Sequence, residues 1–222
     1  MLPWVELGRA KVPGGDEFRL MQRGDEFTIF AGTIGLMGSR QSGSEEVMAD
    51  IAFARVGGRA KARVLIGGLG MGFTLRRVLA KFGADAEIVV AELVPEIVSW
   101  ARGPLAGLHG TSLDDPRVTL KLGDVGNVMA ADAQKFDAIL LDVDNGPEGL
   151  SRPGNDRLYS AGGISAAKAA LRPGGMAAIW SVAPDPKFTK RLGQSGMKVE
   201  ELKARAHGGK GARHVIWVAT RG

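Results

Sequence analysis

The sequence predicts an α/β protein with a doubly wound, mostly parallel sheet of seven strands. Three observations indicate this class. Short apolar runs, typical of buried strands, alternate with segments of helical period from residue 64 onward. A cluster of glycines follows the first of these runs, and the chain ends in two β-rich runs. We expect an antiparallel hairpin at the C-terminus of the sheet and a small β-appendage at the N-terminus of the chain.

The first 40 residues carry turn signals between β-rich runs. Residues 12–16 (VPGGD) and 23–25 (RGD) have turn chemistry. Residues 27–30 and 33–37 are β-rich runs around a glycine, which is consistent with a hairpin. We therefore assign residues 1–40 to the β-appendage and residues 41–222 to the main α/β domain.

A helix is expected from Glu46 to about Arg55. The segment Ser42 to Glu45 has the spacing of a capping box, with Ser at the N-cap and Glu three positions later. Gly57 and Gly58 should end this helix.

The stretch from Val64 to Phe82 is the centre of the predicted domain. Its apolar run ends in a glycine turn, after which the apolar residues recur at i, i+3, i+4 and i+7 of a helix. A strand, a glycine turn and a helix build a nucleotide pocket, because glycines admit close approach and the helix N-terminus offers unpaired N–H groups. The turn glycines are Gly67, Gly68, Gly70 and Gly72.

Four further buried strands are expected along the chain, at residues 86–91, 117–122, 136–141 and 176–180. A helix should begin at Pro95, which suits a first helical position, and run from Glu96 to Arg102. A second should run from Ser165 to Leu171, where the sequence Pro173-Gly174-Gly175 would stop it. The closing runs are residues 197–203 and 214–220, joined by a basic, glycine-rich loop over residues 206–213.

Acidic side chains follow three successive predicted strands. Glu92 ends one strand, Asp124 follows the next, and Asp142 and Asp144 follow the third. Ligands of open α/β sheets bind outside the carboxyl ends of the strands, so these acids should lie around one pocket. A purely structural explanation stays open, because Asp is a common turn residue. Glu92 also stands at the distance from the glycine turn at which a βαβ unit presents an acid to ribose.

The glycine turn does not match the phosphate-binding motifs. In the two possible registers of a dinucleotide fingerprint, the third glycine position falls on Phe73 or Leu75. A Walker-type loop would need Gly-Lys-Ser/Thr, which the turn lacks. The pocket is therefore predicted to take a nucleoside with a short charged tail and no phosphates, as in S-adenosylmethionine.

Composition excludes several classes. The 222 residues are 45% hydrophobic and 24% charged, as in a globular protein, and without Cys there are no disulfides or thiolate sites. The three histidines lack ligand spacing, so no metal is expected. No apolar run is long enough to span a membrane, no signal peptide is recognisable, and a cytoplasmic location is expected. The net charge of +5 leaves a nucleic-acid partner open, although the scattered basic residues do not support it.

Several motifs resemble one family over most of residues 40–185. The chain is similar to the class I S-adenosylmethionine-binding fold, a Rossmann-like fold, and looks most like the spermidine synthases, or polyamine aminopropyltransferases. The matching motifs are Thr74-Leu75-Arg76 after the glycine turn, Asp114 to Arg117, Phe136-Asp137, Gly146-Pro147 and the acid Glu92. The segment Leu171 to Gly175 is shared with nearly all class I methyltransferases.

The resemblance implies roles for individual residues. Glu92 would hold the ribose hydroxyls, Asp124 the adenine amino group, and Asp142 would take the proton from an attacking amine, which reacts only as the free base. Asp144 is the second catalytic candidate. Glu46 and Tyr159 are substrate candidates. The other residues assigned to the nucleoside pocket are Gly68, Gly70, Met71, Gly72, Leu93 and Val125.

The chain departs from the family pattern at three places. Met71 replaces an Asp that grips the amino group of decarboxylated S-adenosylmethionine, Gly43 to Glu46 replaces a Tyr-His-Glu motif, and the motif at Asp142 to Asn145 is shortened. The resemblance implies aminopropyl transfer from decarboxylated S-adenosylmethionine to a small amine, in a homodimer. Two alternatives stay open: an S-adenosylmethionine-dependent methyltransferase, favoured by Met71, and a nucleoside-binding protein without catalysis.

Overall fold

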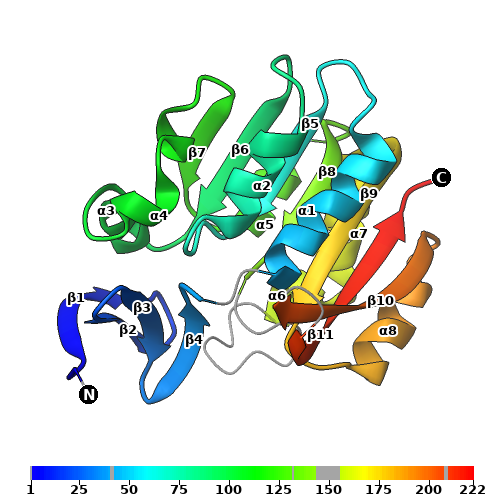
Figure 1. The fold of residues 1–222 in the computed structure, drawn as a ribbon. Coiled ribbons are helices and arrows are strands. Elements are labelled where there is room, and N and C mark those ends of the chain that lie inside the picture. The colour runs from blue at the N-terminus through cyan, green and yellow to red at the C-terminus, as the bar shows by residue number, and fades with distance from the viewer. Residues whose placement is uncertain (1, 41–42, 132, 144–155, 208–209) are drawn as a thin grey trace.

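The computed structural model describes residues 2–40, 43–131, 133–143, 156–207 and 210–222. They form two sheets (Figure 1). The first is antiparallel with strand order β1-β2-β3-β4. Its strands are β1 (Val5–Lys11), β2 (Glu17–Arg23), β3 (Glu26–Ala31) and β4 (Ile34–Gly38). The predicted β-appendage is therefore a four-stranded meander, and its standing as a separate domain stays a prediction.

The second sheet has seven strands in the order β10-β11-β9-β8-β5-β6-β7. The five strands from β9 through β8, β5 and β6 to β7 pair with one another in parallel, whereas β11 pairs antiparallel with both β9 and β10. The predicted fold class is thus confirmed. The strands are β5 (Arg63–Gly67), β6 (Glu87–Glu92), β7 (Val118–Leu122), β8 (Phe136–Leu141), β9 (Leu171–Ser181), β10 (Lys198–His207) and β11 (Lys210–Thr220).

Helices cover both faces of the large sheet (Figure 1). Alternate strand residues point to opposite faces: Val64 and Ile66 pack in one core with α1, α2 and α3, and Leu65 packs in the other with α5, α7 and α8. The helices are α1 (Gly43–Val56), α2 (Phe73–Lys81), α3 (Pro95–Arg102), α4 (Ala106–His109), the 3-10 turn η1 (Ser112–Asp114), α5 (Val125–Ala131), α6 (Asp156–Tyr159), α7 (Ala161–Ala170) and α8 (Pro186–Gly193).

Several predicted boundaries were displaced. Helix α1 begins at Gly43 rather than Glu46, and Ser42, the predicted N-cap, lies outside the described residues. Helix α7 begins four residues before Ser165, because the Ser160 side chain caps it by accepting the N–H of Gly163. Strand β9 begins at Leu171, so the predicted helix stop at residues 173–175 lies in the strand, where the register shifts.

The C-terminal hairpin extends farther than predicted. Residues 206–213 were expected to form a loop, but β10 reaches His207 and β11 begins at Lys210. Backbone N–H and C=O groups pair across the hairpin regardless of its high glycine content, which is why side-chain composition misplaced these strand ends.

The appendage packs against the main domain at two close contacts. A Cβ at Gly8 of β1 would lie 2.6 Å from Nε1 of Trp100 in α3, and one at Gly70 would lie 3.1 Å from Sδ of Met37 in β4. A side chain at Gly8 would therefore collide with Trp100, whereas one at Gly70 would require Met37 to shift by a few tenths of an ångström. The appendage also contributes buried side chains to the core that it shares with α1, α2 and α3.

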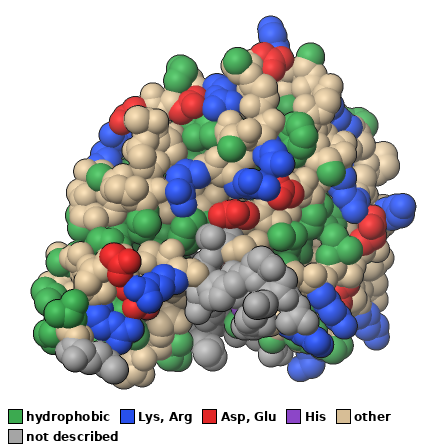
Figure 2. Space-filling view, in the orientation of Figure 1, with side chains coloured by type: hydrophobic (Ala, Val, Ile, Leu, Met, Phe, Trp, Pro, Cys, Tyr) green, Lys and Arg blue, Asp and Glu red, His purple; other side chains and the backbone are tan. Residues whose placement is uncertain are grey.

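Basic and acidic side chains alternate on the face shown in Figure 2, rather than gathering into a patch of one sign. Within the described ranges, no helix is both long and apolar enough to cross a membrane.

Candidate active site

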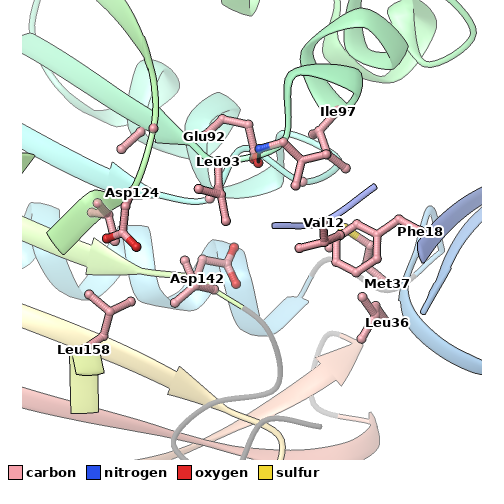
Figure 3. Close-up of a pocket in the computed structure, with 17 residues that line it drawn as sticks. Val12, Phe18, Leu36, Met37, Glu92, Leu93, Ile97, Asp124, Asp142 and Leu158 are labelled. Carbon is pink, nitrogen blue, oxygen red and sulfur yellow. Dashed lines mark hydrogen bonds between the residues drawn. The ribbon is translucent and has the colours of Figure 1, made fainter. Parts of the chain in front are cut away.

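A cavity lies at the carboxyl ends of β5, β6, β7 and β8, roofed by the appendage (Figure 3). The empty space within it, with its open mouth included, is about 750 Å³. The position agrees with the rule that open α/β sheets bind ligands where the strand order reverses, here at β5. Residues from the appendage that line it are Val12, Phe18, Leu36 and Met37.

The glycine turn after β5 forms one side of the cavity. Gly68 has a φ of +91°, and a Cβ there would meet the carbonyl oxygen of Asp142 at 2.3 Å. Gly68 and Gly70 line the cavity, whereas Gly72 is the N-cap of α2 and packs against the ring of His109. The Met71 side chain is buried in the hydrophobic core and does not line the cavity, so its assignment to the nucleoside pocket stays a prediction.

Glu92, at the end of β6, lines the cavity and accepts a hydrogen bond from the glycine turn. Its Oε2 accepts the backbone N–H of Leu69 and its Oε1 accepts that of Val94, both at 2.8 Å. Burial raises the pKa of this carboxyl, and the backbone hydrogen bonds oppose the rise. The carboxylate is therefore held in one orientation between the glycine turn and the start of α3.

Asp124 lies across the cavity from the appendage (Figure 3). Its Oδ1 accepts the N–H of Gly126 at 2.7 Å, at the start of α5. Leu93, Val125 and Leu158 supply apolar surface near the two acids. Leu93 and Val125 were expected in the pocket from the sequence, and both line this cavity.

Asp142 follows β8 and points into the cavity (Figure 3). The Thr74 hydroxyl donates to its Oδ2 at 2.8 Å. Burial, followed by the negative charge of Glu45, raises the pKa of Asp142 to about 7, and the hydrogen bond from Thr74 opposes the rise. A carboxyl with this pKa can accept a proton near neutral pH.

Glu45, which was not among the residues predicted from the sequence, acts by its charge on Asp142, and the substrate role expected for Glu46 stays a prediction. Both glutamates are half-buried, and it is the charge of Glu45 that acts on Asp142. Burial raises the pKa of Glu45, and the Ser44 hydroxyl donates to its Oε2 at 2.7 Å. Helical period could have pointed to Glu45, because Met48, Ala49 and Ala52 lie three, four and seven residues beyond it and all are buried.

Tyr159 ends α6 and is buried beside the site rather than exposed in it. Its hydroxyl donates to the carbonyl oxygen of Val143 at 3.1 Å, which fixes the chain just after Asp142, and its ring packs edge-on against Phe188. Tyr159 does not line the cavity, so its substrate role stays a prediction. Asp144, the second catalytic candidate, lies outside the described residues.

The charge of the cavity restricts its ligands. Its described lining contains the acids Glu92, Asp124 and Asp142 and no Lys or Arg. Such a lining favours a cation and disfavours phosphate, which proteins usually bind with Arg, Lys or backbone N–H groups. In the described part of the chain, no three His, Asp or Glu side chains are grouped so that they could hold a metal ion.

Comparison with known proteins gives consistent matches. The spermine/spermidine synthase domain profile matches residues 44–196. Polyamine aminopropyltransferases of Mycobacterium tuberculosis and Hyperthermus butylicus are each 31% identical to this chain, over 60% and 59% of its length. Those matches cover only 25% and 41% of the relatives, so the chain spans less than half of their length.

Solved structures share the fold. The spermidine synthase of Thermotoga maritima matches with a TM-score of 0.76 and 16% identity, over 98% of this chain and 72% of that one. A probable spermidine synthase of Corynebacterium glutamicum matches with a TM-score of 0.65 and 17% identity, over 96% and 79% of the two chains.

Proposed function

The chain belongs to the spermine/spermidine synthase family, and from this premise we propose that it transfers an aminopropyl group from decarboxylated S-adenosylmethionine to an amine. The observation that carries the proposal is Asp142, a carboxyl whose pKa burial raises to about 7, in the same cavity as the two acids Glu92 and Asp124. A small-molecule amine is the proposed partner. The homodimer and the cytoplasmic location expected from the sequence stay predictions.

The cavity suits the adenosine part of this donor. Glu92 is already fixed by two backbone N–H groups, and each of its oxygens can accept a further hydrogen bond from a ribose hydroxyl. Asp124 can accept from an adenine amino group, with the base between the apolar side chains of Leu93 and Leu158. The acidic lining also attracts the sulfonium charge of the donor.

Asp142 supplies the proton acceptor. An amine reaches the site as an ammonium ion, which the acidic cavity attracts, and it must lose a proton before its nitrogen can attack. The donor supplies a carbon activated by sulfonium. A nitrogen–carbon bond forms as the carbon–sulfur bond breaks, methylthioadenosine leaves with the bonding electrons, and the amine proton goes to Asp142.

An S-adenosylmethionine-dependent methyltransferase is the second candidate. Met71 favours it, because no acid at that position would repel the donor carboxylate. Against it, the described cavity lining offers no Lys or Arg to pair with such a carboxylate, and the Met71 side chain lies in the core. The decarboxylated donor therefore fits the charges better.

Calorimetric titration with decarboxylated S-adenosylmethionine, S-adenosylmethionine and methylthioadenosine tests the proposal. We expect the decarboxylated donor to bind at least about tenfold more tightly than S-adenosylmethionine, because a carboxylate in an unpaired acidic site costs more than 1.4 kcal/mol. If none of the three binds, the proposal is wrong. If S-adenosylmethionine binds best, the methyltransferase reading replaces it.

A transfer assay separates an enzyme from a nucleoside-binding protein. Mass spectrometry should detect methylthioadenosine and an aminopropylated amine when the protein is incubated with the decarboxylated donor and a panel of amines. The Asp142→Asn variant should lose turnover and keep its affinity for methylthioadenosine. Binding of the donor without turnover of any amine would favour the binding protein.

A further inference from the structure

A chain of hydrogen bonds connects the C-terminal hairpin to the catalytic side of the cavity. His214, near the start of β11, places its Nδ1 2.9 Å from Oγ of Ser44, in the first turn of α1. The Ser44 hydroxyl donates to Oε2 of Glu45 at 2.7 Å, and the charge of Glu45 acts on Asp142 after β8. Segments that are far apart in sequence therefore meet at this point.

The hydrogen bonds run in one direction, from His214 through Ser44 to Glu45. A hydroxyl has a single proton, and Ser44 gives it to Glu45, so Ser44 must accept the N–H of His214. This requires the imidazole proton on Nδ1. The reverse tautomer would accept from Ser44 and leave Glu45 without its donor. Both Ser44 and His214 are buried, so water does not readily replace either partner.

Glu45 needs such support because its position is electrostatically unfavourable. Two carboxylates close together in a site of low dielectric repel each other, and a hydroxyl that rotates freely would not hold one of them in place. The ring of His214 is itself fixed by an edge contact with Trp180, with ring centroids 4.7 Å apart. The imidazole is thus a rigid donor at the base of the chain.

We propose that His214 is a positioning residue for the acceptor site: it orients the Ser44 hydroxyl, which holds the Glu45 carboxylate beside Asp142. Glu45 does not itself line the cavity. Its role is to keep a second negative charge at the end of the cavity where the acceptor ammonium meets Asp142. This inference rests on the proposed aminopropyl transfer and adds to it a residue from the C-terminal hairpin.

The tautomer of His214 tests the hydrogen-bond chain without any turnover. The protein has three histidines, so the imidazole ¹⁵N signals of a labelled sample can be assigned by single substitutions. We expect neutral His214 to carry its proton on Nδ1 in the wild-type protein. In Ser44→Ala, the imidazole should lose this preference for the Nδ1 tautomer. A proton on Nε2 in the wild-type protein would overturn the inference.

Acceptor kinetics test the consequence. His214→Leu should raise the KM for the acceptor amine about fivefold to tenfold, the value of one buried hydrogen bond, and leave the affinity for methylthioadenosine unchanged. His214→Asn is the matched control, because its side-chain amide can donate to Ser44 and should restore most of the loss. In the Glu45→Gln background, His214→Leu should not raise the KM for the acceptor amine any further, because His214 and Glu45 act through the same contact.

The outcomes are distinguishable. If the wild-type protein turns over an amine and His214→Leu does so with the same KM, the inference fails and the proposed function stands. If the wild type binds neither donor nor amine, the proposed function fails and the inference falls with it. Should His214→Leu not fold, as judged by thermal unfolding, Ser44→Ala must show the same rise in KM. Failure of His214→Asn to restore activity would reduce His214 to a packing role.

Discussion

Replacing Asp142 with asparagine should stabilise the fold above neutral pH while it abolishes transfer. The folded protein raises the pKa of Asp142 from 3.8 to about 7, so the folded state binds a proton more tightly than the unfolded state does. Ionising a carboxyl in this position therefore costs stability. The cost is absent below pH 4, grows as the pH rises, and is complete above pH 7. At 1.36 kcal/mol per pKa unit it amounts to about 4 kcal/mol.

The side chain is partly exposed to the cavity, and solvent there reduces this figure, so we expect Asp142→Asn to gain between about 2 and 4 kcal/mol at pH 8. Asparagine keeps an oxygen that can accept from Thr74, so the variant should match the wild type at pH 4. Urea unfolding at pH 4, 6 and 8 measures the difference. A stability difference that does not change with pH, or one that favours the wild type at pH 8, would refute the reasoning.

Three further predictions concern the charge pair, a buried ion cluster and the docking of the appendage. Glu45→Gln should move the acid limb of the kcat/KM profile about one pH unit lower, because removing a like charge lowers the pKa of Asp142. Asp137→Asn should lower the free energy of unfolding by about 3 kcal/mol, because this buried carboxylate is the shared partner of two arginines. Gly8→Ala should destabilise the protein by about 1–3 kcal/mol and weaken donor binding, since the methyl group would collide with Trp100.

Each prediction has a matched control. Thr74→Val removes the hydrogen bond that lowers the pKa of Asp142, so the acid limb of the kcat/KM profile of this variant should move to higher pH. If the acid limbs of Glu45→Gln and Thr74→Val moved in the same direction, the assignment of this limb to Asp142 would be contradicted. Gly58→Ala meets no atom within 4 Å and should be tolerated, unlike Gly8→Ala. For Asp137→Asn, chemical unfolding should show the loss at neutral pH. A loss no larger than that of Asp156→Asn, an exposed acid, would show that the cluster with Arg59 and Arg172 contributes little.

The sheet was predictable because each strand carries its own signal. β8 was predicted to the residue, because Phe136 and the apolar run from Ala138 to Leu141 stand between the charged residues Lys135 and Asp142, and the strand is buried along its whole length. The resemblance to spermidine synthases is confirmed by the domain match. The ends of α7 and β9 were misjudged because a serine cap and a register shift decided them, and neither follows from hydrophobic period.

The site was predictable where its residues follow strands and less so elsewhere. Glu92, Asp124 and Asp142 could be placed together because parallel strands bring their carboxyl ends to one edge. The roof formed by Phe18 and Met37 was not predicted, because no local pattern tells which surface an appended sheet will cover. Met71 was assigned by its position in a motif, and only the structure shows that its side chain turns into the core.

The difference between Glu45 and Glu46 shows what the sequence contains and what it lacks. Helical period alone places Glu45 on the buried face of α1, so this choice was open to sequence reasoning. The group that orients Glu45 was not, because His214 is 170 residues away from Ser44 and reaches it only through the antiparallel return of β11 beside β9. A charge can thus be located from local pattern, whereas the group that orients it depends on the order of strands in the sheet.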